Sequence, residues 1–353
     1  MTKAKTWFKI RVKERIEIMN KNNVLTYAGG GGSSSTAFTM AEILLSLTII
    51  GVVAAITLPS LTGNINERTW NTQRKALYAR FSQAISLMPA LNGFGTLAEA
   101  TSSAAAVDTA GETFVTSGLS KVLKINNICD NEHLADCGIV SSYTNMAGSK
   151  VVLPTTLNEL NSLLTSVTIT AANVSYKIID TKAVAFETQN GESIVMYYNP
   201  TCGVDYFQTS NWNESHMTVI GTSMCANFVY DLNGSKGPNT VGKDIGFLTA
   251  FNSIDSKVVA PVPISSNDQA SSTSYHDAIS ICKSKDSESR LPNIDELSSM
   301  FVNGKFIGTF SAGDYWSSSR YDSKFSWRVS ANSGLRSTSN TQLGSFNVRC
   351  IKR

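Results

Sequence analysis

The sequence is poor in charge, in histidine and in the short motifs that mark catalytic or metal sites. Only 16% of its 353 residues are charged and only three are histidine, which leaves little material for a multi-histidine metal centre or an imidazole-based active site. There is no Gly-x-Ser-x-Gly, no phosphate-binding glycine loop, no His-Glu-x-x-His and no Cys-x-x-Cys. We therefore expect no catalytic residue and no enzyme activity.

The net charge also excludes one class of partner. The whole chain carries a formal charge of +3. Residues 1–37 alone hold five Lys and two Arg against two Glu, a charge of +5, so residues 38–353 carry −2. A strong electrostatic attraction to nucleic acid needs a basic surface, so we expect no nucleic-acid partner.

The six cysteines fall into three neighbouring couples along the chain. Each couple lies in a different region, which favours three local disulfides formed in an oxidising compartment. The alternative is that the cysteines are reduced, buried thiols. The predicted pairs are Cys129 with Cys137, Cys202 with Cys225, and Cys282 with Cys350.

Residues 38–58 form a long apolar run in which Glu42 is the only ionisable group. As a helix, 21 residues would span roughly 30 Å, the thickness of a bilayer core. Residues 3–21 before it are basic, which favours a cytoplasmic N-terminal side. This pattern predicts a single-pass helix in the inner (cytoplasmic) membrane, with the N-terminus in the cytoplasm and the residues after the helix outside.

The helical pattern continues beyond Pro59, which would only kink it. Trp70, Leu77, Phe81, Ile85 and Met88 recur at helical spacing. The pattern stops near residues 89–95, which predicts one helix of roughly 50 residues. We expect its first half to be compatible with lipid and its second half to dock on a globular head.

The remaining segments predict an α+β fold. Residues 183–187 and 193–198 bracket Asn190-Gly191 and predict a β-hairpin, and residues 226–231 predict a further strand. The expected architecture is a long N-terminal transmembrane and stem helix packed on a small antiparallel sheet, followed by a mixed α+β C-terminal unit. The predicted ranges are a leader (1–37), the helix (38–92), the head (93–260), a Pro/Ser-rich linker (261–274) and a C-terminal unit (275–353) that folds independently.

The segment AFTMAEILLSLTIIGVVAAITLP, residues 37–59, resembles the processing and assembly segment of type IV pilins and type II secretion pseudopilins. The resemblance implies cleavage between Ala37 and Phe38 by a prepilin peptidase, followed by N-methylation of Phe38. It also implies partners: other pilin or pseudopilin subunits, inner-membrane assembly machinery, and membrane lipid before assembly. This chain departs from the family in two ways. The family usually has Gly where this chain has Ala37. The leader is also long, so Met19 is an alternative start to Met1.

Glu42 places a carboxylate inside the apolar run. A carboxylate inside a membrane costs about 2.5–3.5 kcal/mol unless it is paired. Its partner would be a cation of another chain, such as the Phe38 amine that cleavage creates. The alternative is that Glu42 lies at headgroup depth without a role.

Residues 225–244 resemble a loop in the heads of bacterial pseudopilin-type proteins. The oxygen-bearing side chains of Asp231, Asn233, Ser235 and Asp244 are candidate Ca²⁺ ligands. The same Gly, Asn and Pro residues also form turns without metal. We expect no other cofactor.

Residues 275–353 contain RLPNIDEL, YWSSS, SWRV and NVRC and resemble the Lcl-like C-terminal domain family, which is similar in pattern to the C-type-lectin-like and sulfatase-modifying-factor folds. The resemblance implies a lectin-like, disulfide-tied unit, and several members of those folds bind glycans. Asn293, followed by Asp295 and Glu296, predicts a helix start. We expect Trp316 and Trp327 to be core residues. The candidate exposed loops for ligands are 303–305, Asp314 and 320–324, and no ligand residue is assigned.

Together these patterns predict a structural subunit, minor or at the tip, of a type IV pilus or a type II secretion pseudopilus. The expected final location is a periplasmic or extracellular filament. The alternative is a surface adhesin that displays a glycan-binding C-terminal unit on a pilin stem.

Overall fold

A computed structural model describes residues 40–91, 110–130, 132–153, 156–160, 168–171, 174–177, 183–198, 218–219, 224–251, 257–332 and 334–352. The chain divides into two compact units, residues 1–62 and 63–353. The first contains the beginning of one long helix, and the second contains all of the described strands.

The described helices are α2 (Met40–Leu91), α4 (Leu157–Leu160), α5 (Tyr275–Lys285), α6 (Ile294–Val302), α7 (Gly304–Ile307) and the short turns η1 (Phe114–Gly118), η2 (Leu119–Lys121) and η3 (Leu134–Cys137). The strands up to residue 259 are β1 (Ile125–Cys129), β2 (Ser142–Thr144), β3 (Lys150–Val152), β4 (Thr168–Ala171), β5 (Val174–Lys177), β6 (Ala183–Thr188), β7 (Ser193–Tyr198), β8 (Thr218–Val219), β9 (Met224–Asp231), β10 (Ile245–Phe251) and β11 (Lys257–Val259). The later strands are β12 (Val262–Pro263), β13 (Ala270–Thr273), β14 (Ser289–Arg290), β15 (Asp314–Arg320), β16 (Phe325–Ser330), β17 (Leu335–Asn340), β18 (Phe346–Val348) and β19 (Ile351–Lys352).

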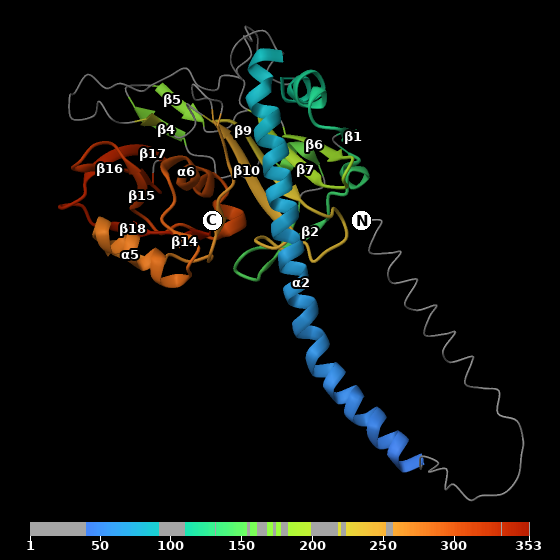
Figure 1. Ribbon diagram of the computed structural model, residues 1–353. Helices are drawn as coiled ribbons and strands as arrows, with labels where there is room; N and C mark the ends of the chain where they lie inside the picture. The colour runs from blue at the N-terminus through green and yellow to red at the C-terminus, as the bar shows by residue number, and fades with distance from the viewer. Residues whose placement is uncertain are drawn as a thin grey trace, which may run out of the picture. The chain divides into compact units, whose positions relative to one another are not determined.

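Helix α2 is continuous over 52 residues and passes through Pro59 (Figure 1). Nevertheless, the part of the chain that the structure describes holds no helix with both the length and the apolarity of a membrane span. The expected transmembrane stem and the expected single-pass location in the inner membrane were therefore wrong.

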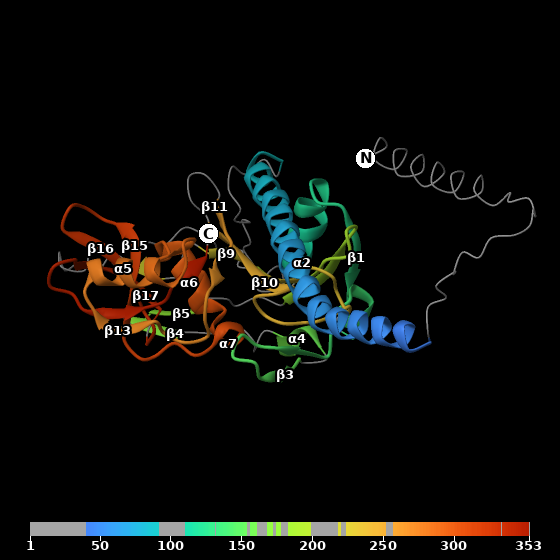
Figure 2. The ribbon, with the colours of Figure 1, turned by 60° about the horizontal axis from the view of Figure 1, so that its bottom comes forward.

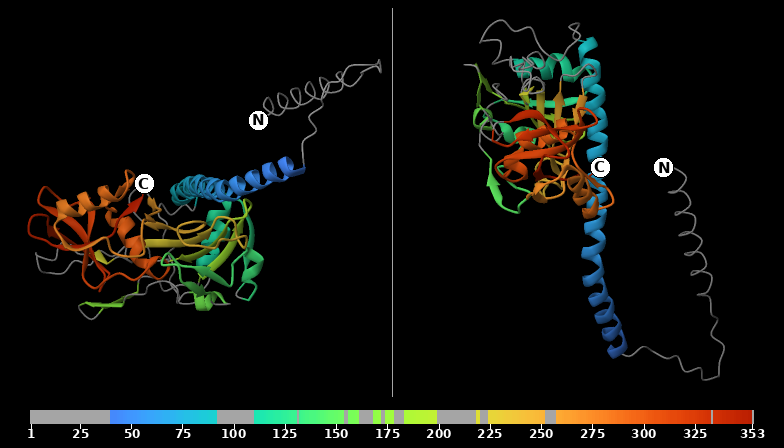
Figure 3. Two further views of the ribbon diagram at one scale, coloured as in Figure 1. Left: turned by 90° about the horizontal axis from the view of Figure 1, so that it is seen from below. Right: turned by 90° about the vertical axis from the view of Figure 1, so that its left-hand side faces the viewer.

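The second half of α2 packs on a six-stranded sheet with the order β1-β6-β7-β9-β10-β11, in which every pair is antiparallel. The helical spacing seen in the sequence becomes a buried stripe of Leu77, Phe81, Ile85 and Met88. Phe81 lies edge-on against Phe228 of β9, with ring centroids 4.9 Å apart. The sheet is larger than the small one expected, and α2 runs along one face of it (Figure 3).

The opposite face of this sheet is also covered. All six residues of β7 are buried. Ile194 and Met196 belong to the α2 core, whereas Val195 and Tyr197 belong to a second core that includes Leu297. An antiparallel sheet with one solvated face would alternate apolar and polar residues, so the burial of β7 on both sides requires a second layer.

That second layer includes the C-terminal elements (Figure 2). Their main sheet has the order β13-β18-β15-β16-β17-β8, and β8 comes from residues before the predicted unit. The segment predicted as a linker contributes β12 and β13, which pair with β19 and β18. We conclude that the fold is mixed α and β, and that residues 275–353 share a core with the head instead of forming an isolated body.

Candidate functional site

The first part of α2 exposes an unusual number of large apolar side chains. The exposed fractions are 61% for Leu44, 60% for Leu47, 57% for Ile49 and 64% for Ile50. Large apolar patches on a protein surface mark sites where another molecule binds. This segment is therefore the first candidate functional surface.

Several predicted assembly residues cannot be compared with this surface. Ala37 and Phe38 lie outside the described residues. Glu42 and Pro59 lie within the span of α2, and their side chains lie outside the described part. Cleavage, methylation and the pairing of Glu42 therefore stay predictions.

An ion pair between a partly exposed arginine and a buried carboxylate, which the sequence analysis missed, joins the second half of α2 to the β6–β7 hairpin. Arg80 donates from Nη1 to Glu192 Oε2 at 3.2 Å, and its Nη2 pairs with Glu192 Oε1. Thr188 also donates to Glu192. Glu192 is 5% exposed, so the orientation of the helix on the sheet depends on this contact.

The Asp231 loop joins β9 to β10 and brings two carboxylates together. Asp244 is fully buried and accepts hydrogen bonds from the backbone N–H groups of Asn239 and Thr240, both at 2.8 Å. Asp231 Oδ1 accepts from the N–H of Asn233 at 3.1 Å. With its nitrogen facing the two acceptors, the Asn239 amide donates to Asp231 Oδ2 and to the Gly234 carbonyl, both at 3.2 Å. The loop is thus an internally bonded turn.

The predicted calcium ligands differ in their environments. Burial raises the pKa of Asp231 to about 7, and the charge of Asp244 adds to this shift. The buried Oδ1 of Asn233 has no hydrogen-bond partner in the part of the chain that the structure describes, whereas Ser235 is exposed. Across the described residues, no group of three or more His, Cys, Asp or Glu side chains lies close enough to hold a metal ion.

The structure contains two of the predicted disulfides, Cys129–Cys137 and Cys282–Cys350. Cys225 is also disulfide-bonded, while Cys202 lies outside the described residues. Cys282–Cys350 ties α5 to the chain end, and Cys129–Cys137 closes a tight loop after β1.

The two C-terminal tryptophans differ. Trp316 is fully buried and donates from Nε1 to the Thr273 carbonyl at 2.8 Å, which fits the predicted core role. Trp327 is only half-buried and lies edge-on to exposed Tyr321, with ring centroids 6.0 Å apart. Its position on the surface differs from the core position that we predicted.

The predicted ligand loops are only partly exposed. Residues 320–324 lie on the surface, but Asp314 is half-buried in an ion pair with Arg328. Asn303 is fully buried, so the prediction of an exposed loop at 303–305 holds only for Lys305. Asn303 faces the sheet because its amide bonds to that of Asn227 of β9.

A buried polar cluster joins the sheet to α6. The Asn227 and Asn303 amides exchange two hydrogen bonds of 3.0 Å. Thr249 of β10 donates to Asn227 at 2.8 Å and lies 2.6 Å from the Ser299 hydroxyl. No local sequence signal predicts this cluster, because residues 227 and 303 are far apart in the chain.

The start of α6 follows the sequence prediction. Asn293 caps the helix and forms a capping box with Glu296. Arg290 holds the same carboxylate through contacts of 2.7 and 2.6 Å. Because Glu296 serves both contacts, RLPNIDEL has a structural role in the fold.

Comparison with known proteins found no matching protein-family model and no matching curated protein.

Proposed function

We propose that this protein is a structural subunit of a pilus-like filament, either a type IV pilus or a type II secretion pseudopilus. The observation that carries the proposal is the division of α2 into a first part with exposed apolar side chains and a second part packed on the sheet. Burial of apolar surface releases about 25 cal/mol per Å². Packing of the exposed parts of neighbouring copies would therefore drive assembly.

The proposed partners are other subunits of the same kind and a prepilin peptidase that cuts before Phe38. Mass spectrometry of the N-terminal peptide from cells that contain this peptidase should give a mature start at Phe38. A start at residues 60–63 would contradict the proposal, because it would remove the apolar part of α2.

A matched pair of leucine substitutions tests assembly itself. Leu47 is 60% exposed on α2, and Leu343 is 84% exposed on the turn before β18. Leu47→Glu should abolish incorporation into sheared filaments, since a charge would lie in the helix contact. Leu343→Glu should leave incorporation unchanged, and equal effects of both substitutions would contradict the proposal.

A calcium ion at the Asp231 loop is a second element of the proposal. The unpartnered Asn233 Oδ1, with Asp231 beside it, supports it, because Ca²⁺ takes oxygen ligands of this kind. Calcium should raise the melting temperature relative to EDTA, and Asp231→Asn should remove that difference. Mg²⁺ is the control ion. An equal melting temperature with Ca²⁺ and with EDTA would contradict the calcium site and mean that the loop is a turn without metal.

Display of a glycan-binding surface is the second candidate function. The half-exposed pair of Tyr321 and Trp327 supports it, because aromatic faces beside strand hydroxyls suit sugar rings. Trp327 lies opposite Thr338 in the β16–β17 register. Trp327→Ala should abolish binding on a glycan array while the protein stays folded, and the absence of any binding by the unsubstituted protein would exclude this function.

A further inference from the structure

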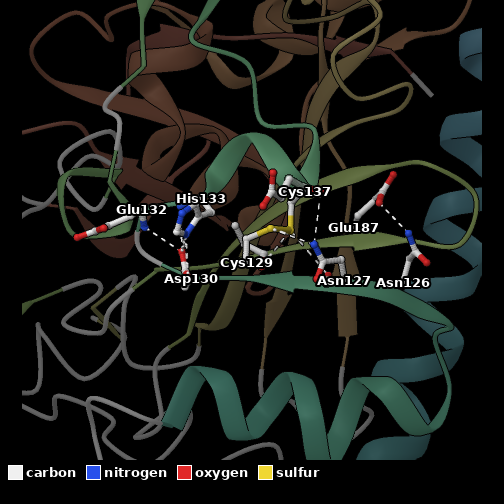
Figure 4. Close-up of a disulfide and its surroundings, with 10 residues drawn as sticks. Asn126, Asn127, Cys129, Asp130, Glu132, His133, Cys137 and Glu187 are labelled. Carbon is white, nitrogen blue, oxygen red and sulfur yellow. Dashed lines mark hydrogen bonds and ion pairs between the residues drawn. A yellow bond between two sulfur atoms is a disulfide. The ribbon is translucent and has the colours of Figure 1, made fainter.

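An acidic, disulfide-closed loop lies at one edge of the six-stranded sheet. Between Cys129 and Cys137 the side chains of Asp130, Glu132 and Asp136 are all exposed. Figure 4 shows Asp130, Glu132 and His133 beside this disulfide. Asp130 also accepts hydrogen bonds from the N–H groups of Glu132 and His133, at 3.1 and 2.9 Å. The described part of the loop therefore presents three exposed carboxylates.

A basic groove lies at the other edge of the same sheet. It has a volume of about 1040 Å³, and one wall is a single face of α2 that includes Trp70, Arg74 and Tyr78. The other wall comes from β11, β12 and the C-terminal elements. Val258, Val259 and Val262 add apolar side chains to this second wall.

The charges along this groove are unbalanced. Its five cations are Arg74, Lys75, Lys243, Arg290 and Lys352, and its three carboxylates are Glu67, Glu288 and Glu296.

Two of these cations are available to a partner. Lys75 and Lys243 are exposed, and neither has a carboxylate partner among the described residues. Arg74 donates to the carbonyls of Gly242 and Lys243, at 3.1 and 2.7 Å, and forms no ion pair with a carboxylate of the described residues. Arg290 and Glu296 already form a pair. Lys352 also has a partner, Asp286, at 3.8 Å. The groove therefore keeps three cations, Arg74, Lys75 and Lys243, against the two carboxylates of Glu67 and Glu288.

The loop follows β1 and the groove borders β11, and these strands are the opposite edges of the sheet. We propose that the acidic loop of one copy of this chain docks in the basic groove of the next copy. The contact joins two different surfaces, so it is heterologous and can repeat without closing. This inference rests on the proposed filament and names the head surfaces that would set the arrangement of its subunits.

Charge reversal on each surface tests the contact in the full-length protein. The groove variant carries Lys75→Glu and Lys243→Glu, and the loop variant carries Glu132→Lys and Asp136→Lys, which leaves Asp130 in place. Each variant alone should associate about tenfold more weakly in sedimentation, because like charges then meet. Raising the salt concentration from about 50 mM to about 500 mM should also weaken the self-association of the unsubstituted protein.

Mixing the two variants is the decisive experiment. The groove variant has two acidic surfaces and the loop variant has two basic ones, so an alternating assembly of both should form where neither assembles alone. A control with Lys150→Glu and Lys283→Glu, both exposed and outside the groove, should associate normally. A mixture that associates no better than its components, or a control that fails equally, would overturn the inference.

Carbodiimide cross-linking between ¹⁵N-labelled and unlabelled copies separates this inference from the proposed function. The expected intermolecular cross-links join Lys75 or Lys243 to Glu132 or Asp136. If these cross-links form in short oligomers and no filament is ever produced, the docking contact stands and the proposed function fails. If filaments form and both charge variants assemble normally, the proposed function stands and the docking contact is wrong.

Discussion

At the scale of single residues, the contact between Arg80 and Glu192 contributes more to stability than an exposed ion pair would. The Arg80 side chain is 32% exposed, but that of Glu192 is only 6% exposed. Loss of the arginine would therefore leave a buried carboxylate with Thr188 as its remaining side-chain partner. An unpaired buried charge costs far more than an exposed pair contributes.

We expect Arg80→Leu to lower the free energy of unfolding by about 2 kcal/mol, less than for a fully buried pair because Arg80 is partly solvated. The double variant Arg80→Leu with Glu192→Leu should recover most of this loss. Urea unfolding followed by circular dichroism measures both. A double variant less stable than the single one would show that the charge of Glu192 is not the cause.

Tyr143 provides a prediction for alkaline pH. Its ring is 3% exposed, and burial raises its pKa to about 12, against about 10 in the unfolded chain. Above pH 10 the unfolded chain loses the phenolic proton of Tyr143 while the folded protein keeps it. The free energy of unfolding therefore falls as the pH rises from 10 to 12. We expect a loss of up to about 2 kcal/mol from this residue, and Tyr143→Phe should make the decline between pH 10 and 12 shallower.

At the scale of elements, the two described disulfides close loops of very different length. Cys282 and Cys350 are 68 residues apart, and Cys129 and Cys137 are 8 apart. Chain entropy assigns about 4 kcal/mol to the first and about 2–3 kcal/mol to the second. The double variant Cys282→Ala with Cys350→Ala should therefore melt lower than Cys129→Ala with Cys137→Ala in calorimetry. The reverse order would contradict the loop-entropy argument.

Local signals predicted some of these elements well. The β6–β7 hairpin forms around Asn190-Gly191, with Gly191 at a φ of +81°. The stripe of Leu77, Phe81, Ile85 and Met88 likewise lies on the core face of α2. These features depend on residues close in sequence, so periodicity and turn chemistry were sufficient.

Other elements depend on distant partners, and the sequence analysis missed them. Residues 261–274 looked like a linker because they are rich in Pro and Ser, yet β12 pairs with β19 and β13 with β18. The ladder partners lie more than 70 residues away. Composition predicts local flexibility, but it cannot reveal that a chain end returns to pair with such a segment.

At the scale of the whole molecule, both faces of the central sheet are covered, and the C-terminal elements form part of that cover. Leu297, Phe301 and Phe306 belong to the same core as Val195 and Tyr197. Excision of residues 264–353 would expose this apolar face and separate Asn303 from Asn227. We therefore expect that fragment not to fold cooperatively by itself, which differs from the independent unit that its flanking cysteines suggested.

Substitutions in the cluster of Asn227 and Asn303 test this shared core in the intact protein. Asn227→Ala removes the amide that Asn303 and Thr249 bond to, which leaves buried polar groups unsatisfied and should cost about 1–3 kcal/mol. Because the cluster joins the sheet to α6, fluorescence of a form that keeps only Trp316 and Trp327, with Phe at Trp7, Trp70 and Trp212, should report the same shifted transition as circular dichroism of the whole chain. The variant with Leu at both positions removes both amides and should be more stable than Asn227→Ala. Two separate transitions, with only one of them shifted, would mean that the sheet and the C-terminal elements unfold independently.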